Sequence, residues 1–176
     1  MMDTVLLAGF GGQGVMFLGK VLAYSGMLAG REVCWIPSYG PEMRGGTANC
    51  SVILATDEIH SPVVEMADTG IVLNQPSYDK FLPRIKPGGA LVVNNSIVDL
   101  GRGRRDIDLI SLPAAEMAND LGNPALANMV SLGALLSKLK MIDLAGVEKA
   151  LAAIMGEKRP DMLEINLSAI QQGMKI

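Results

Sequence analysis

Residues 4–14 read Thr-Val-Leu-Leu-Ala-Gly-Phe-Gly-Gly-Gln-Gly, and this stretch decides the expected fold. Thr4–Ala8 is a short apolar run typical of a buried strand, and the glycines follow it at once. From Gln13 to Ala29 apolar residues recur close to every 3.6 positions, which is the spacing of a helix. A strand, a glycine turn and a helix in this order are typical of a phosphate-binding unit, because glycine lets the backbone approach an anion and the helix N-terminus attracts it. A tight turn that binds no ligand is the alternative.

Strands and helices continue to alternate beyond this unit, and helices alone follow from Pro113 onward. This order predicts an α/β fold, a three-layer sandwich with an open, mostly parallel, Rossmann-like sheet and a helical C-terminal part. No linker or repeat interrupts it, so residues 1–176 are expected to form a single domain. The further strands are expected at Val33–Pro37, Thr47–Ala55, Ile71–Asn74, Ala90–Asn94 and Ile107–Leu112, the further helices at Pro76–Ile85, Pro113–Leu121, Pro124–Leu139, Asp143–Met155 and Pro160–Gly173, and a turn at Lys86–Gly89.

The composition is unusually apolar for a domain that stands alone. Hydrophobic residues make up 49% of the 176 residues and charged residues only 19%, against about 25% charged in ordinary domains. We therefore expect partners to cover part of the surface. The net charge of −3 argues against a nucleic-acid binder, and no apolar run reaches the roughly 18 residues of a membrane span. Residues 1–4 lack the basic segment of a signal peptide and cysteines are few, so a cytoplasmic location is expected.

Residues able to ligate a metal or to act as nucleophiles are scarce. Cys34 and Cys50 are the only cysteines and His60 is the only histidine. This set is too small for a structural zinc site or an iron–sulfur cluster built by this chain alone. We interpret both cysteines as inert buried thiols, with Cys34 on a central strand, and His60 as a surface residue. No catalytic residue and no metal ligand is predicted.

The glycine turn alone does not indicate a nicotinamide cofactor. In dinucleotide-binding folds an acidic residue about 20 positions after the glycines, at the end of the second strand, binds the ribose. Here that place holds Ile36–Tyr39, and the next acidic residue is Glu42. The sequence therefore favours a phosphate-bearing ligand other than NAD.

A second loop follows the second expected strand and reads Pro-Ser-Tyr-Gly-Pro-Glu-Met-Arg-Gly-Gly-Thr over residues 37–47. In a doubly wound sheet it is expected at the carboxyl edge, beside the glycine turn. Arg44 followed by two glycines offers a guanidinium and accessible backbone N–H groups, which suit a phosphate or a carboxylate. The alternative is an exposed ion pair between Arg44 and Glu42.

Together, Gly9–Val15 and Pro37–Thr47 resemble the gamma subunit, or gamma domain, of the 2-oxoacid:ferredoxin oxidoreductases. The resemblance covers nearly the whole chain in order, and it is strongest to the 2-oxoglutarate type, with the branched-chain 2-oxoisovalerate type close behind. It extends to Ser61-Pro62, Lys86–Gly89, Leu121–Asn123 and Asn128–Gly133.

The resemblance implies a role in a multisubunit enzyme of anaerobic metabolism. Such enzymes convert a 2-oxoacid and coenzyme A to an acyl-CoA, CO₂ and reduced ferredoxin. Thiamine diphosphate and the iron–sulfur clusters are carried by the other subunits, and the gamma part is associated with coenzyme A binding and assembly. This chain is thus expected to be a non-catalytic gamma subunit, inactive alone. Its implied partners are alpha, beta and ferredoxin-like delta subunits and, through the complex, ferredoxin.

The expected ligand site combines both loops with one helical residue. The residues expected to contact coenzyme A or its phosphates are Gly9, Gly11, Gly12, Gln13, Gly14, Ser38, Tyr39, Arg44, Gly45, Gly46, Thr47 and Asn128. Two other functions stay open: a free-standing Rossmann-like NAD(P)-binding reductase, and an assembly scaffold whose glycine turn binds nothing. The isolated chain is expected to self-associate, for example as a homodimer, because its apolar surface would lack partners.

Overall fold

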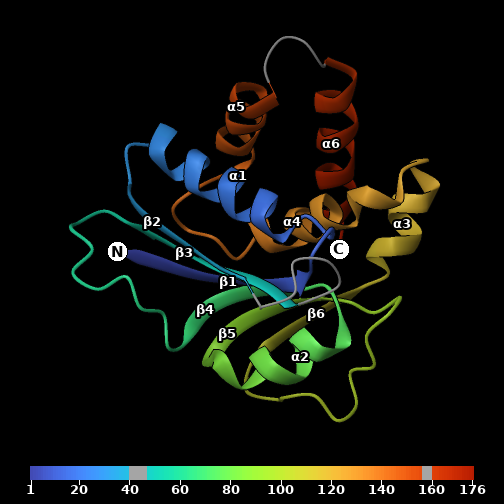
Figure 1. Cartoon of the computed structure of the whole chain (residues 1–176), viewed down its shortest axis with the longest axis horizontal. Helices are drawn as coiled ribbons and strands as arrows, with labels where there is room; N and C mark the ends of the chain where they lie inside the picture. The colour runs from blue at the N-terminus through green and yellow to red at the C-terminus, as the bar shows by residue number, and fades with distance from the viewer. Residues whose placement is uncertain (40–46, 156–159) are drawn as a thin grey trace.

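A computed structural model of the chain describes residues 1–39, 47–155 and 160–176. Its centre is a six-stranded sheet in the order β2-β3-β1-β4-β5-β6 (Figure 1). The strands are β1 (Met2–Phe10), β2 (Glu32–Tyr39), β3 (Thr47–Ala55), β4 (Ala67–Val72), β5 (Ile85–Asn94) and β6 (Asp108–Leu112). The expected α/β class with an open sheet is confirmed.

Most of the sheet is parallel, as the sequence predicts. β1 pairs in parallel with β4, β4 with β5 and β5 with β6, whereas β3 is antiparallel to both β1 and β2. Among the described strands, β3 alone therefore runs against the others. The carboxyl ends of β1, β2, β4, β5 and β6 consequently meet at one edge of the sheet, together with the start of β3.

Helices cover both faces of the sheet and form a three-layer sandwich (Figure 1). One face carries nearly all of them, and the other carries α2 with a following 3₁₀ turn. The helices are α1 (Val15–Leu28), α2 (Gln75–Phe81), α3 (Ala114–Asp120), α4 (Ala127–Leu136), α5 (Leu144–Met155) and α6 (Pro160–Gly173), with 3₁₀ turns η1 (Leu82–Arg84) and η2 (Pro124–Leu126).

Helix α1 lies very close to the sheet because two glycines face it. A Cβ atom on Gly19 would come within 2.5 Å of Trp35 Nε1, and one on Gly26 would come within 2.5 Å of Leu54 Cδ2. Real Cβ atoms almost never show such distances, so a larger residue at either position would force the neighbouring side chains to shift. The close approach holds the N-terminus of α1 directly over the carboxyl end of β1.

Helix α4 is the centre of the helical layer. Every residue from Asn128 to Leu136 is buried, because α4 packs between the sheet and α6. This explains why its sequence is apolar on all sides rather than on one stripe. The burial fixes the first turn of α4, and with it Asn128, near the start of α1.

The structure corrects the sequence-based expectations at three places. Lys86–Gly89 forms no turn between elements but lies within β5, where the pairing with β4 jumps from Ala67–Ile85 to Thr69–Ala90. The helix expected at Pro124–Leu139 begins as η2 and ends at Leu136. The strand expected to be central at Val33–Pro37 lies at the sheet edge, because the chain returns through β3 to pair beside β1.

Candidate functional site

The glycine turn leaves the start of α1 open. Gly12 and Gly14 have φ angles of 100° and 79°, a region that favours glycine. Gly14 is the N-cap of α1, so no side chain caps the helix, and its first turn holds no acidic residue. The first backbone N–H groups of any helix lack partners within it, and here they carry the positive end of a 14-residue helix. This arrangement suits an anion.

Gln13 braces this turn with its side chain. Its Oε1 accepts hydrogen bonds from the Phe10 backbone N–H (2.7 Å) and from Asn74 Nδ2 (3.0 Å). Its Nε2 donates to the Leu73 carbonyl oxygen at 3.0 Å. The Gln13 amide therefore ties the end of β1 to the end of β4. Gly9 is required beneath it, because a Cβ there would come within 2.8 Å of Gln13 Oε1.

Asn128 reaches the same turn from α4. A Cβ on Gly14 would come within 2.1 Å of Asn128 Nδ2, so the amide lies directly against the Gly14 backbone. Asn128 Oδ1 accepts a hydrogen bond from the Met129 N–H at 2.7 Å. The hydrogen bonds of the described residues include none from Asn128 Nδ2, so this donor is available beside the turn.

A cavity of about 310 Å³ opens next to the glycine turn at the carboxyl edge of β1, β4 and β5. Three of the predicted site residues line it, namely Gly12, Gln13 and Asn128. The rest of its wall is mostly apolar and comes from Leu73, Asn94, Ile97, Ala115, Pro124, Ala125 and Ala127. The cavity thus combines an apolar wall with polar groups at one end, as small-molecule sites commonly do.

The described ends of the second loop lie at the same edge of the sheet, next to β1. Tyr39 is in register with Ala48 and through it with Gly9, and Thr47 is opposite Phe10. Ser38 precedes Tyr39 on the edge strand β2 and is exposed. Neither Ser38 nor Thr47 lines the 310 Å³ cavity. Arg44, Gly45 and Gly46 lie outside the described residues.

Two asparagines at this edge were missed by the sequence analysis. Asn74 is buried after β4, where it caps α2 by accepting from the Ser77 N–H at 2.9 Å. Asn94 is buried at the end of β5, and its Oδ1 accepts from the Ala115 and Ser96 N–H groups at 3.3 Å each. Their signal in the sequence is a polar residue at the end of an apolar strand, which marks a ligand-facing edge in parallel sheets.

The two cysteines and the histidine differ in their burial. Cys50 is fully buried, and burial raises its pKa to about 11, so it is a neutral thiol near pH 7. Cys34 is only half-buried, because β2 is an edge strand rather than the expected central one. His60 is exposed. The described residues contain no group of three or more metal-ligating side chains, and no helix among them is long and apolar enough to cross a membrane.

The fold and the turn together define a class, a Rossmann-like α/β domain with an open helix N-terminus at the carboxyl edge of its sheet. Over residues 4–176 the chain matches the family described as pyruvate ferredoxin/flavodoxin oxidoreductase. The chain belongs to this family, which confirms the resemblance noted in the sequence.

Curated relatives carry the names of two kinds of oxidoreductase subunit. The ketoisovalerate oxidoreductase subunit VorA of Methanothermobacter marburgensis is 33% identical over 96% of this chain, which spans 35% of that protein's length. The 2-oxoglutarate synthase subunit KorC of Archaeoglobus fulgidus is 32% identical over 98% of this chain and 87% of its own length. The chain therefore spans about a third of VorA but most of KorC.

Solved structures share the fold along the whole chain. The 2-oxoglutarate:ferredoxin oxidoreductase of Magnetococcus marinus, with 2-oxoglutarate, coenzyme A and succinyl-CoA bound, superposes with a TM-score of 0.88 and 26% identity, over 99% of this chain and 30% of that one. The keto/oxoacid ferredoxin oxidoreductase gamma subunit of Geobacter sulfurreducens superposes with a TM-score of 0.82 and 26% identity, over 98% of this chain and 96% of that one.

Proposed function

We propose that this chain is the gamma subunit of a thiamine diphosphate-dependent 2-oxoacid:ferredoxin oxidoreductase and supplies a coenzyme A site at the carboxyl edge of its sheet. The observation that carries the proposal is the uncapped start of α1 at Gly14, which opens beside a cavity in a chain of this family. The relatives' names support two substrates for the assembled enzyme, 2-oxoglutarate and a branched-chain 2-oxoacid.

Coenzyme A carries phosphates at one end and a long, mostly uncharged arm, and the site offers groups for both. Backbone N–H groups at Gly12, Gly14 and the start of α1 suit a phosphate. Asn128 Nδ2 adds a donor at the polar end of the cavity, whose apolar wall suits the arm. Gln13 holds the turn in shape rather than contacting the ligand, since its amide is occupied by Phe10, Leu73 and Asn74.

The residues of this chain do not fit the redox cofactors of such an enzyme. A cluster held by four thiolates needs more cysteines than the two present, and Cys50 is a buried neutral thiol. We therefore assign the clusters to partner subunits and, as the family resemblance implies, thiamine diphosphate as well; these partners are alpha, beta and ferredoxin-like delta subunits. The chain purified alone is expected to show no 2-oxoacid oxidation.

A free-standing NAD(P)-binding reductase is disfavoured by the strand order. Dinucleotide-binding folds place the second strand beside the first, so that an acid at its end reaches the ribose. Here β3 separates β1 from β2, and β2 ends in Ser38-Tyr39 without an acid. A scaffold whose turn binds nothing is the remaining alternative, and a binding experiment separates it from our proposal.

The test is calorimetric titration of coenzyme A into the assembled complex carrying Arg44→Ala or Gly12→Val in this chain. Arg44→Ala should weaken binding by about 1.5–3 kcal/mol, the range for a hydrogen bond to a charged group. A Cβ on Gly12 would meet no atom of the described residues within 4 Å, so Val at this position should obstruct a ligand rather than the core, although the φ of 100° adds strain.

The matched control is Arg102→Ala, which removes an exposed arginine in the loop before β6 and should leave the affinity unchanged. A complex that assembles and keeps its full affinity for coenzyme A in both site variants would favour the scaffold alternative.

A further inference from the structure

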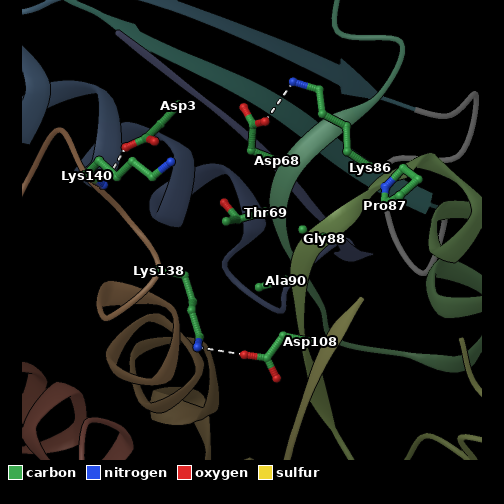
Figure 2. A pocket seen from close by; sticks show the side chains of 11 residues that line it. Asp3, Asp68, Thr69, Lys86, Pro87, Gly88, Ala90, Asp108, Lys138 and Lys140 are labelled. Carbon is green, nitrogen blue, oxygen red and sulfur yellow. Dashed lines mark hydrogen bonds and ion pairs between the residues drawn. The ribbon is translucent and has the colours of Figure 1, made fainter. Parts of the chain in front are cut away.

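A second cavity, of about 260 Å³, lies at the opposite edge of the sheet, where β1, β4, β5 and β6 begin. Figure 2 shows charged side chains of both signs around it, from the strands and from the segment after α4. The lining residues are Asp3, Asp68, Thr69, Lys86, Pro87, Gly88, Gly89, Ala90, Asp108, Lys138 and Lys140. It shares no lining residue with the cavity at the carboxyl edge.

The irregular start of β5 builds one wall of this cavity. Lys86–Gly89 leaves the ladder between the pairs Ala67–Ile85 and Thr69–Ala90. Gly88 has a φ of 77°, and a Cβ on Gly89 would come within 2.5 Å of the Asp68 carbonyl oxygen, so the wall needs glycine at both places. Lys86–Gly89 is one of the motifs on which the family resemblance rests, and its structural role is to shape this wall of the cavity.

The three aspartates at the cavity already have partners. Asp3 Oδ2 accepts from the backbone N–H groups of Lys140 (2.7 Å) and Met141 (2.9 Å). Asp108 pairs with Lys138 at 2.6 Å. The charge of Asp108 is therefore neutralised by a lysine, whereas Asp3 keeps its negative charge and is stabilised by two backbone N–H groups.

Asp68 is held in the same way from two strands. It accepts from Lys86 Nζ at 2.7 Å and from the Thr4 hydroxyl at 2.6 Å. Burial acts to raise the pKa of Asp68, but the hydrogen bonds from Lys86 and Thr4 and the charge of Lys86 outweigh it. The pKa of Asp68 is therefore lowered, and the carboxyl is ionised near neutral pH.

Two groups at the cavity have hydrogen-bonding capacity left over. Thr69 is 5% exposed, and its hydroxyl has no hydrogen-bond partner in the described part of the chain. A buried hydroxyl without a partner destabilises the fold, because it has lost its hydrogen bonds to water. The ammonium of Lys140 enters no ion pair among the described residues, whereas Lys86 and Lys138 each pair with one aspartate.

The register brings these groups to one place. Thr69 is in register with Ala90, and Ala90 with Asp108, so the three form a row across β4, β5 and β6. The row lies opposite the segment that carries Lys138 and Lys140 (Figure 2). A small molecule in the cavity would meet the Thr69 hydroxyl and lysine ammonium groups from two directions.

We propose that this cavity is a second binding site, which takes a compact oxyanion such as a phosphate or carboxylate group between Thr69, Lys138 and Lys140. The three aspartates and three lysines of the lining balance in charge, and Asp68 and Asp108 each pair with one lysine. The ammonium of Lys140 is thus the one lysine donor of the lining that enters no ion pair among the described residues, and it can bond an oxyanion. Charge-assisted hydrogen bonds from ammonium groups to oxyanions are short and strong, and the Thr69 hydroxyl would gain the partner it lacks.

The test uses the full chain and inorganic phosphate as the probe, with acetate as a second arm that separates a phosphate site from a carboxylate site. Backbone amide shifts in ¹H–¹⁵N spectra report where each ion binds. Saturable shifts at Thr69, Gly89, Ala90 and Lys140 are expected with at least one of the two ions. Shifts confined to the start of α1, or none that saturate, would overturn the proposal.

Two variants make the test specific to this cavity. Lys140→Gln and Thr69→Val should each weaken binding at least about tenfold, the effect of losing one hydrogen bond to a charged group. Lys149→Gln, which removes an exposed lysine on α5, should leave binding unchanged. Equal affinity in all four proteins would refute the site.

Thermal unfolding separates a bound ion from a merely unsatisfied hydroxyl. Thr69→Val should unfold at the same or a higher temperature without the ion, because an unpartnered polar group is removed. A ligand that binds only the folded chain raises the unfolding temperature. Addition of the ion should therefore raise the unfolding temperature of the wild type but not the unfolding temperature of Thr69→Val. An equal rise in both proteins would count against Thr69 as a contact.

Discussion

At the residue scale, Gln13 shows how one side chain can brace a glycine turn. It follows Gly11 and Gly12 in the turn, yet its amide points back to Phe10, Leu73 and Asn74. The bonds to Phe10 and Leu73 take up backbone groups at the ends of β1 and β4, which such a turn would otherwise leave unpaired. The conformation of the turn, and hence the direction of the first N–H groups of α1, depends on this brace.

Gln13→Ala should lower the free energy of unfolding by about 1–3 kcal/mol, because it leaves the Phe10 N–H and the Leu73 carbonyl without their partner. Chemical denaturation of the full chain measures the change. Gln171→Ala, at an exposed position on α6, is the control and should stay within about 0.5 kcal/mol of the wild type. Unchanged stability together with weaker coenzyme A binding would instead make Gln13 a direct contact, as the sequence analysis expected.

At the scale of elements, α4 and α6 are joined through a reciprocal pair of glycines. A Cβ on Gly133 would come within 2.0 Å of the Ile170 carbonyl oxygen, and one on Gly173 within 1.9 Å of the Val130 carbonyl oxygen. The two helix backbones therefore touch at a point where no side chain fits. This contact keeps α4 pressed onto the sheet, and α4 carries Asn128 to the glycine turn.

Gly173→Ala should destabilise the chain by about 1–3 kcal/mol or more, because the added methyl group meets backbone atoms that cannot move aside without separating the helices. Thermal or urea unfolding measures the loss. Gly146→Ala on α5 is the matched control, since its Cβ would have a nearest neighbour at 3.3 Å, the side chain of Asp143. That variant should be neutral or up to about 1 kcal/mol more stable, because alanine favours a helix. Equal losses in both variants would argue against a special contact at Gly173.

At the scale of the whole molecule, exposed apolar side chains stand on the edge strand and in the segment before β4. Trp35 and Ile36 are 36% and 38% exposed on the edge strand β2, and Val63 and Met66 are exposed in the segment before β4. One side of β2 also presents unpaired backbone groups, which invite another chain. These features support the expected assembly surface.

Ile36→Lys should shift the lone chain toward the monomer in size-exclusion chromatography, because a lysine on an edge strand opposes pairing with a second chain. Its unfolding temperature should change little, since the side chain is partly exposed. Ile176→Lys, at a 65% exposed C-terminal position, should leave the association unchanged. A wild-type chain that is already monomeric at all concentrations would contradict the prediction.

The sequence by itself determined the class of fold and the family. The local pattern of Thr4–Gly14 is sufficient for a strand, a glycine turn and a helix, and the predicted strand at Thr47–Ala55 matches β3 at both ends. Such features depend on neighbours in the chain, so periodicity and glycine positions reveal them. The long loop motifs indicated the family in the same way, and the match over residues 4–176 confirms it.

Only the tertiary structure decided which residues meet. Strand order and register are set by pairing between distant segments, and these placed β3 between β1 and β2, Asn128 against Gly14, and Lys140 across from Thr69. The hydrogen bond between Gln13 and Asn74 could not be foreseen, because the two residues lie 61 positions apart in the chain. The cavity at the amino edge had no local signal at all, since its charges come from four strands and from the segment after a helix. The sequence specifies which side chains are present, but the packing of distant segments determines the distances between them and therefore whether they form a site.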